Sequence, residues 1–190
     1  MATLEEVREA VKIILPINKK LVLLHCTTNY PAPLNEVNLR AMLTMEKEFN
    51  LLVGYSDHTK GIDISLAAVA MGACVIEKHF TLDKNLPGPD HKASLEPEEL
   101  KEMVKGIRNI QAALGNGIKK PNPSEMETAK VARKSIVAGQ DIKKGTKIKE
   151  EMLAIKRPGT GIMPKYFKKI IGKIAKSDIK KDELLKWEKI

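Results

Sequence analysis

The sequence predicts an α/β fold of three strand–helix units behind a leading helix, followed by a small module of short strands and turns. Short apolar runs of strand length alternate with amphipathic helical segments over residues 1–115. Strands that alternate with helices pair in parallel through right-handed crossovers. The charge balance then changes, because residues 1–118 hold 13 Lys and Arg against 15 Asp and Glu, whereas residues 119–190 hold 20 against 9. Two modules of different character are therefore expected.

The first two elements are a helix and a strand. Apolar residues recur with helical spacing over residues 3–15, and Thr3 with Glu6 forms a capping-box pair at the start. The run Leu21–Leu24 that follows is continuously apolar, which is typical of a strand buried on both faces. We expect this strand to end near His25.

The same alternation repeats twice more along the first module. The further helices are predicted at 35–48, 62–72 and 97–114, and the further strands at 51–55 and 73–77. Three parallel strands cannot close a barrel, and a freestanding sheet leaves apolar edges open to mispairing. We therefore expect Met1 to be an internal position of a larger fold.

A linker and a second module follow. Residues 116–127 are rich in turn formers and separate a domain at 1–115 from one at 128–190. The second module contains an internal echo at an offset of 37 residues, in which Ala138, Asp141, Ile142, Lys143, Lys144 and Ile148 recur as Ala175, Asp178, Ile179, Lys180, Lys181 and Leu185. This repeat predicts a small pseudo-symmetric fold.

Composition excludes several classes of protein. No stretch approaches the ~20 apolar residues that span a bilayer, and the N-terminus lacks the pattern of a secretory signal, so we predict a cytoplasmic protein without a membrane partner. The two cysteines, Cys26 and Cys74, are interpreted as buried structural thiols. Nucleic acid is not an expected partner, because the basic module has no Arg-rich run and few aromatic residues. A lysine-rich solvated surface explains its charge.

Three of the four histidines occur where a strand gives way to a loop. His58 and His79 follow consecutive strands and are 21 residues apart, about one strand–helix repeat. The carboxyl ends of parallel strands meet at one edge, so the two imidazoles are expected to converge. Two neutral imidazoles favour a divalent metal site completed by carboxylate, water or substrate oxygens. His25, beside Cys26 on an apolar strand, is interpreted as structural.

Polar residues surround the two histidines in the sequence. Ser56 and Thr59 can donate to a phosphate or carboxylate, and Asp57 can orient an imidazole. After the third strand, the segment Pro87–Pro89 predicts a rigid loop that holds Asp90 over the mouth of the site.

These segments together resemble the sialic acid synthase family. The similarity is carried by Cys26–Pro31, Gly54–Thr59, Glu77–Thr81, Pro87–Asp90, Ser135–Ala138 and Lys156–Gly159. The resemblance covers essentially the whole chain. It implies the C-terminal portion of a (β/α)8 TIM barrel over residues 1–115, followed by a small β-rich antifreeze-like (SAF) domain over 128–190.

The resemblance also implies an activity. Family members condense phosphoenolpyruvate with an N-acetylmannosamine-type sugar to give a nonulosonic acid and phosphate. The implied metal is Mn²⁺, with Mg²⁺ or Co²⁺ as substitutes, and its ligands are His58 and His79. A metal that polarises the sugar aldehyde agrees with this pair of imidazoles.

Further site residues are implied by the same resemblance. Ser56 would bind phosphoenolpyruvate, and so would Thr28, which stands where some bacterial relatives carry Asn. Tyr30 and Asp90 would face the sugar. Arg157 would reach from the SAF domain into the barrel of a partner subunit, in a domain-swapped homodimer.

Some family features have no counterpart in this sequence. The lysines that clamp phosphoenolpyruvate belong to the first strands of the family's barrel, so we predict no useful synthase activity without an added N-terminal barrel half. The sequence leaves open whether the sugar is N-acetylmannosamine, its 6-phosphate or a diacetamido trideoxy sugar. The alternative hypothesis is a non-catalytic truncated product whose basic SAF domain acts as a binding or dimerisation module.

Overall fold

A computed structural model describes residues 1–190 as two compact units, Met1–Gly117 and Ile118–Ile190. Each unit has its own buried core. The two units are described separately below. No helix in the structure is long and apolar enough to cross a bilayer.

The first unit is built on a three-stranded parallel sheet. Its strands are β1 (Val22–Cys26), β2 (Leu52–Asp57) and β3 (Ile76–Lys78), in the order β1-β2-β3. The parallel pairing confirms the alternation predicted from the sequence. The register places Cys26 opposite Ser56, Ser56 opposite Glu77 and Asp57 opposite Lys78. Successive side chains of a strand point to opposite faces, so Ser56 and Asp57 face different sides of the sheet.

The helices of the first unit lie close to their predicted positions. Thr3 and Glu6 form the expected capping box at the start of the leading helix, and Glu96 with Glu99 forms a second one before the last helix. The elements are α1 (Leu4–Ile14), η1 (Leu34–Glu36), α2 (Arg40–Phe49), α3 (Asp63–Ala70), η2 (His91–Ala93) and α4 (Pro97–Leu114).

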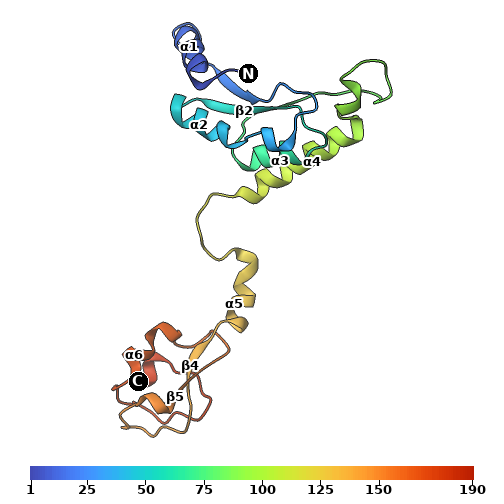
Figure 1. Ribbon diagram of the computed structural model, residues 1–190. Coiled ribbons are helices and arrows are strands. Elements are labelled where there is room, and N and C mark those ends of the chain that lie inside the picture. The colour runs from blue at the N-terminus through green and yellow to red at the C-terminus, as the bar shows by residue number, and fades with distance from the viewer. The chain divides into compact units, whose positions relative to one another are not determined.

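Helices α2, α3 and α4 lie on one side of the sheet (Figure 1). Val53 and Tyr55 of β2 pack there against Met42, Met45 and Ala68 from the helices. This covered face forms the core of the first unit. The helices on this side therefore bury the odd-numbered side chains Val53 and Tyr55 of β2.

The opposite face of the sheet remains exposed. Val22 is 38% exposed, Leu24 36% and Val75 43%. Gly54 lies between them, and a side chain there would meet Leu24 and the Val75 backbone at 2.5 and 2.6 Å. The expectation that the first strand is buried on both faces is thus wrong in this structure, because residues 1–117 cover only one of them. We call this surface the open sheet face.

The second unit is small and mixed. Residues 126–132 form a helix, although the sequence assigned the first two of them to a linker. Strands β4 and β5 pair antiparallel, with Ser135 opposite Lys156. The elements are η3 (Pro123–Glu125), α5 (Met126–Ala132), β4 (Ser135–Ala138), η4 (Glu150–Met152), β5 (Leu153–Lys156), η5 (Pro164–Tyr166), α6 (Phe167–Ile170) and η6 (Trp187–Lys189).

The second unit has the predicted internal pseudo-symmetry. Ile142 and Ile179 exchange two backbone hydrogen bonds of 2.8 Å each. The Asp141 carboxylate accepts from the Lys181 amide and the Asp178 carboxylate accepts from the Lys144 amide, again at 2.8 Å each. Repeated residues thus make reciprocal contacts across one axis. The sequence echo is confirmed as a structural repeat.

Candidate functional site

Three aromatic rings converge at the carboxyl edge of the sheet. The ring centroids of His58 and His79 are 5.1 Å apart, and that of Tyr30 lies 5.3 Å from His58 and 4.2 Å from His79. Tyr30 belongs to the loop after β1, whereas His58 and His79 directly follow β2 and β3. The predicted convergence of the two histidines is confirmed, and Tyr30 joins them.

Backbone hydrogen bonds hold the two histidines in place. The Ala32 amide donates to the His58 carbonyl, and the Leu95 amide donates to the His79 carbonyl, both at 2.9 Å. The His58 Nδ1 atom also lies 3.3 Å from the Thr28 carbonyl oxygen. The loops that follow the strands therefore close around the histidine backbone.

Asp90 and Ser94 lie beside the aromatic rings. The Asp90 carboxylate is 3.9 Å from His79 Nδ1, and the Tyr30 hydroxyl is 3.1 Å from Ser94 Oγ. Ser94 in turn donates to the Asp90 carbonyl at 2.8 Å. Partial burial raises the pKa of Tyr30, so its hydroxyl stays protonated near neutral pH. The structure thus brings Tyr30 and Asp90 together with both histidines.

The two imidazoles supply only part of the ligand set that a divalent ion needs. No group of three or more His, Cys, Asp or Glu side chains is arranged to hold a metal. Further possible donors are Cys26, with Sγ 3.8 Å from His58 Nδ1, and the Asp90 carboxylate, 3.9 Å from His79 Nδ1. Two imidazole nitrogens suit Mn²⁺, Co²⁺ or Mg²⁺ only if oxygen ligands complete the coordination sphere. Residues His58 and His79 would hold such an ion, and water or substrate would supply the rest.

Ser56 lies on the open sheet face, on strand β2 and two residues before His58. Ser56 is 6% exposed and its hydroxyl donates to the Glu77 carboxylate at 2.6 Å. Glu77 was not among the residues singled out from the sequence, although strand pairing places it beside Ser56. Thr28 is exposed, and its contact with His58 is made by its carbonyl rather than its side chain. The binding of phosphoenolpyruvate by Ser56 and Thr28 stays a prediction.

The hypothesis that Asp57 orients an imidazole by bonding to it directly is wrong in this structure, since its carboxylate bonds to Thr59, Ser65 and Lys78 instead. The Asp57 side chain points to the covered face and is completely buried. It pairs with the Lys78 ammonium group at 2.9 Å. The alternation of side chains along β2 explains the outcome, because it puts Asp57 on the same face as Tyr55. Lys78 is not among the site residues predicted from the sequence.

The predictions for His25 and for the two cysteines have different outcomes. His25 lies with its ring Nε2 2.8 Å from the Val37 carbonyl oxygen, as expected for a structural residue. Cys74 is exposed and Cys26 is only partly buried, so the expectation of two buried thiols is wrong.

Arg157 lies in the second unit, in the turn after β5. It is exposed, and the adjoining turn is held by the Ser135 hydroxyl, which donates to the Pro158 carbonyl at 2.7 Å. The Gly159 amide donates to the Lys130 carbonyl, also at 2.7 Å. These contacts hold the backbone that follows Arg157 in place. The role of Arg157 in sugar binding stays a prediction.

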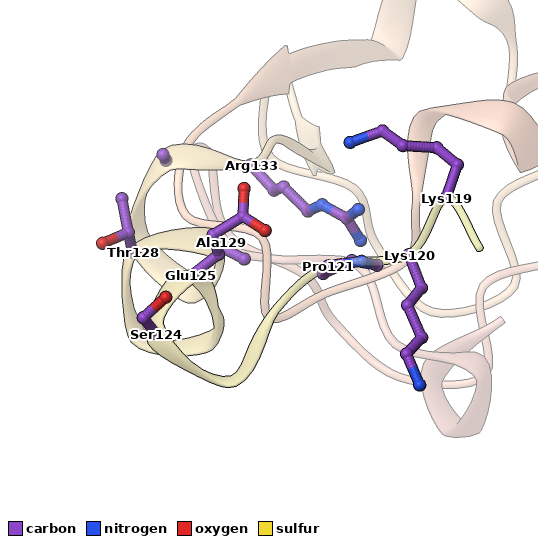
Figure 2. A pocket seen from close by; sticks show the side chains of 9 residues that line it. Lys119, Lys120, Pro121, Ser124, Glu125, Thr128, Ala129 and Arg133 are labelled. Carbon is purple, nitrogen blue, oxygen red and sulfur yellow. The ribbon is translucent and has the colours of Figure 1, made fainter. Parts of the chain in front are cut away.

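A hollow in the second unit is lined by none of the predicted site residues (Figure 2). It is bordered by the cations Lys119, Lys120 and Arg133 and by the carboxylate of Glu125. Figure 2 shows Lys119 and Lys120 pointing away from each other.

Comparison with known proteins places this architecture in a family. A sequence profile of the NeuB family matches residues 1–119. The chain belongs to the NeuB family. A profile of the SAF domain matches residues 133–190 of the same chain. The predicted fold class, parallel barrel-type α/β units followed by an SAF domain, is confirmed.

Individual relatives agree with this assignment. The NeuB chain is 56% identical over 98% of its length to the N,N'-diacetyllegionaminic acid synthase of Campylobacter jejuni and 49% identical over its full length to that of Legionella pneumophila. It is 38% identical over 99% of its length to human N-acetylneuraminate-9-phosphate synthase. It spans 57%, 55% and 53% of these proteins, respectively. The NeuB chain thus spans about half the length of each relative.

Solved structures show the same relationship. The crystal structure of spore coat polysaccharide biosynthesis protein SpsE from Bacillus subtilis matches with a TM-score of 0.59 and 37% identity, covering 100% of this chain and 58% of SpsE. The N-acetylneuraminic acid synthetase of Leptospira borgpetersenii, crystallised with citrate, matches with a TM-score of 0.62 and 41% identity. That match covers 67% of this chain and 45% of the synthetase.

Proposed function

We propose that this chain forms the metal- and sugar-binding part of a nonulosonic acid synthase, which condenses phosphoenolpyruvate with an N-acetylated amino sugar and releases phosphate. The convergence of Tyr30, His58, His79 and Asp90 is the observation that carries the proposal. These residues come from three separate strand-end loops, and the carboxyl edge of parallel strands is where barrel enzymes place catalytic groups.

Each residue has a distinct role in the proposal. His58 and His79 hold a divalent ion, in first place Mn²⁺, which when bound supplies Lewis-acid polarisation of the sugar carbonyl. Tyr30, kept protonated by burial, donates a hydrogen bond to the sugar. The Asp90 carboxylate accepts hydrogen bonds from sugar hydroxyls. Arg157 adds a cation from the SAF domain of a partner subunit, in a domain-swapped homodimer.

The open sheet face indicates what else the reaction requires. Ser56 and Glu77 are its polar residues near the site, and no lysine or arginine accompanies them on the strands β1–β3 of that face. Phosphoenolpyruvate carries several negative charges and needs positive partners. We therefore propose that further barrel strands, contributed by residues outside this sequence, cover the face and supply the cationic groups.

The similarity values favour one class of sugar. Two diacetyllegionaminic acid synthases are 56% and 49% identical to the chain, whereas two pseudaminic acid synthases are 41% and 40% and the human neuraminate-9-phosphate synthase 38% identical. We propose a diacetamido trideoxy sugar as the substrate, in preference to N-acetylmannosamine or its 6-phosphate.

Reconstitution tests this function. The chain would be mixed or fused with the unmatched remainder of the Campylobacter relative, and phosphate release measured with Mn²⁺, phosphoenolpyruvate and each of the three sugars. We expect turnover only in the reconstituted protein, with the diacetamido sugar preferred. His58→Ala and His79→Ala should abolish it, whereas His25→Gln serves as the matched histidine control. Absence of phosphate release with every sugar, or turnover that survives both alanine variants, would reject the proposal.

A further inference from the structure

A buried ion pair lies directly beneath the two candidate metal ligands. The Lys78 ammonium group is 2.9 Å from Asp57 Oδ2, and the two side chains are 3% and 0% exposed. Asp57 immediately precedes His58, and Lys78 immediately precedes His79. The strand register makes the two residues direct neighbours across β2 and β3. The pair therefore joins the last residues of the two strands that carry the histidines.

Every acceptor position of the buried carboxylate is used. Oδ1 accepts from the amide and the hydroxyl of Thr59, both at 2.8 Å. Oδ2 accepts from Ser65 Oγ at 2.6 Å as well as from Lys78. The Lys78 ammonium group also donates to the Thr59 carbonyl at 2.5 Å. The loop after β2 is thus bound on both sides of His58, since Asp57 precedes that histidine and Thr59 follows it.

Stability alone is a poor reason for this arrangement. Removing two charges from water costs several kcal/mol per ion, and well-packed apolar residues of similar volume often serve equally well or better. Apart from Thr59 and Ser65, the covered face near the pair is occupied by core residues, with Val53 and Tyr55 on the same strand. What an apolar pair would not reproduce is the set of directional bonds to Thr59, because aliphatic side chains neither donate nor accept.

We propose that Asp57 and Lys78 are positioning residues, which fix the ends of β2 and β3 so that the His58 and His79 imidazoles face a common metal ion. This inference rests on the proposed metal site. The His58 and His79 rings stand at 80° to each other with centroids 5.1 Å apart. A small rotation of either strand end would move a ring nitrogen by an amount that metal coordination does not tolerate.

Titration of the full chain with Mn²⁺ tests the inference without any need for catalysis. Binding would be followed by the electron paramagnetic resonance signal of free Mn²⁺. Asp57→Asn and Lys78→Met should each weaken binding by about tenfold or more, as loss of a supporting partner around a metal ligand does. The milder Ser65→Ala, which removes one hydrogen bond to Asp57, should weaken it by about threefold. Lys78→Arg, which keeps the positive charge, should bind Mn²⁺ with an affinity close to that of the unaltered chain.

Two controls separate positioning from folding. Lys84→Met removes a lysine from the surface pair with Glu99 and should leave Mn²⁺ affinity unchanged. In addition, ¹⁵N imidazole spectra of the metal-free chain should show shifted His58 and His79 signals in Ser65→Ala and in the Asp57 variant, with His25 unmoved. Ser65→Ala keeps the proposal testable if Asp57→Asn and Lys78→Met do not fold.

The outcomes also distinguish this inference from the proposed function. If the unaltered chain does not bind Mn²⁺, or His58→Ala binds it equally well, the metal site itself is wrong and the inference falls with it. If His58→Ala loses binding while Ser65→Ala, and whichever of Asp57→Asn and Lys78→Met folds, keep wild-type affinity and unshifted imidazole signals, the positioning role alone is overturned.

Discussion

Ser56 and Glu77 form a direct hydrogen bond across neighbouring strands, with the serine hydroxyl 2.6 Å from the carboxylate. Both lie on the open sheet face, and Ser56 is nearly buried although its partner is exposed. A hydroxyl whose direction is set by a carboxylate presents its oxygen in one orientation. An anionic substrate that accepts from Ser56 must therefore compete with Glu77 for the same proton.

The Ser56 hydroxyl is expected to matter for phosphoenolpyruvate rather than for the sugar. In the reconstituted synthase, Ser56→Ala should raise the KM for phosphoenolpyruvate by about tenfold, the value of one hydrogen bond to a charged group. The KM for the sugar should change less than twofold. Thr44→Ala on helix α2 removes a hydroxyl that donates within its own helix, to the Arg40 carbonyl, and is the matched control. Equal effects on both KM values would contradict this assignment.

The Tyr30 hydroxyl is expected to contribute to sugar binding. Tyr30→Phe removes only the oxygen that lies 3.1 Å from Ser94 Oγ and keeps the ring beside His79. The KM for the sugar should rise by between threefold and tenfold, as loss of one hydrogen bond predicts. Steady-state kinetics at saturating phosphoenolpyruvate would measure it. Tyr166→Phe in the SAF domain makes the same atomic change and should have no effect; a matching rise there would argue for a general loss of structure.

Gly159 is expected to tolerate no side chain. A Cβ atom there would lie 2.5 Å from the Arg133 Cβ and 3.2 Å from the Ala129 carbonyl. Gly159→Ala should therefore lower the free energy of unfolding of the SAF domain by about 1–3 kcal/mol, as overpacking does. Urea denaturation would measure the loss. Gly139→Ala meets its nearest atoms at 3.5 Å and should change the same free energy less, so equal losses would count against the steric explanation.

The reciprocal pair Asp141 and Asp178 is expected to make the SAF domain sensitive to acid. Backbone hydrogen bonds from Lys181 and Lys144 lower the pKa of these two carboxyls below their ordinary value of 3.8. A lowered folded-state pKa gives stability that is present above the ordinary value and is lost as the pH falls through the folded-state pKa. The temperature at which the SAF domain unfolds should therefore decrease as the pH drops below about 4.

The matched variants for this prediction are Asp141→Asn and Asp178→Asn. Each keeps a side-chain oxygen as acceptor and removes one titrating group. The unfolding temperature of each variant should depend less steeply on pH below pH 4 than that of the unaltered domain. A pH dependence identical to that of the unaltered domain would show that other carboxyls are responsible.

The segment between the two units is expected to be the first site of proteolysis. Residues 111–122 are exposed, and trypsin can cleave there after Lys119, whereas the Lys120–Pro121 bond resists it. Brief digestion, followed by mass spectrometry, should give two resistant fragments that separate near Lys120. Rapid degradation of residues 1–115 beside a stable SAF fragment would instead favour the alternative of a non-catalytic chain with a binding or dimerisation module.

Much of the fold could be predicted from local patterns. The capping pair of Thr3 and Glu6 and the alternation of apolar runs gave the helices and parallel strands, because hydrogen bonding near a helix end and burial of one face are local requirements. Strand-end placement also predicted that His58 and His79 meet. The repeat of Asp141 and Asp178 is visible in the sequence, whereas the reciprocal hydrogen bonds between the repeats are seen only in the structure.

The sequence by itself thus determined the family, the order of elements and the pair of imidazoles. Only the tertiary structure decided which face each strand residue joins, and with it the pairing of Asp57 with Lys78 and of Ser56 with Glu77. The physical reason is register: a side chain changes face with every step along a strand, so its partner depends on the alignment of neighbouring strands. That alignment is set by packing between distant residues and cannot be seen in any one segment.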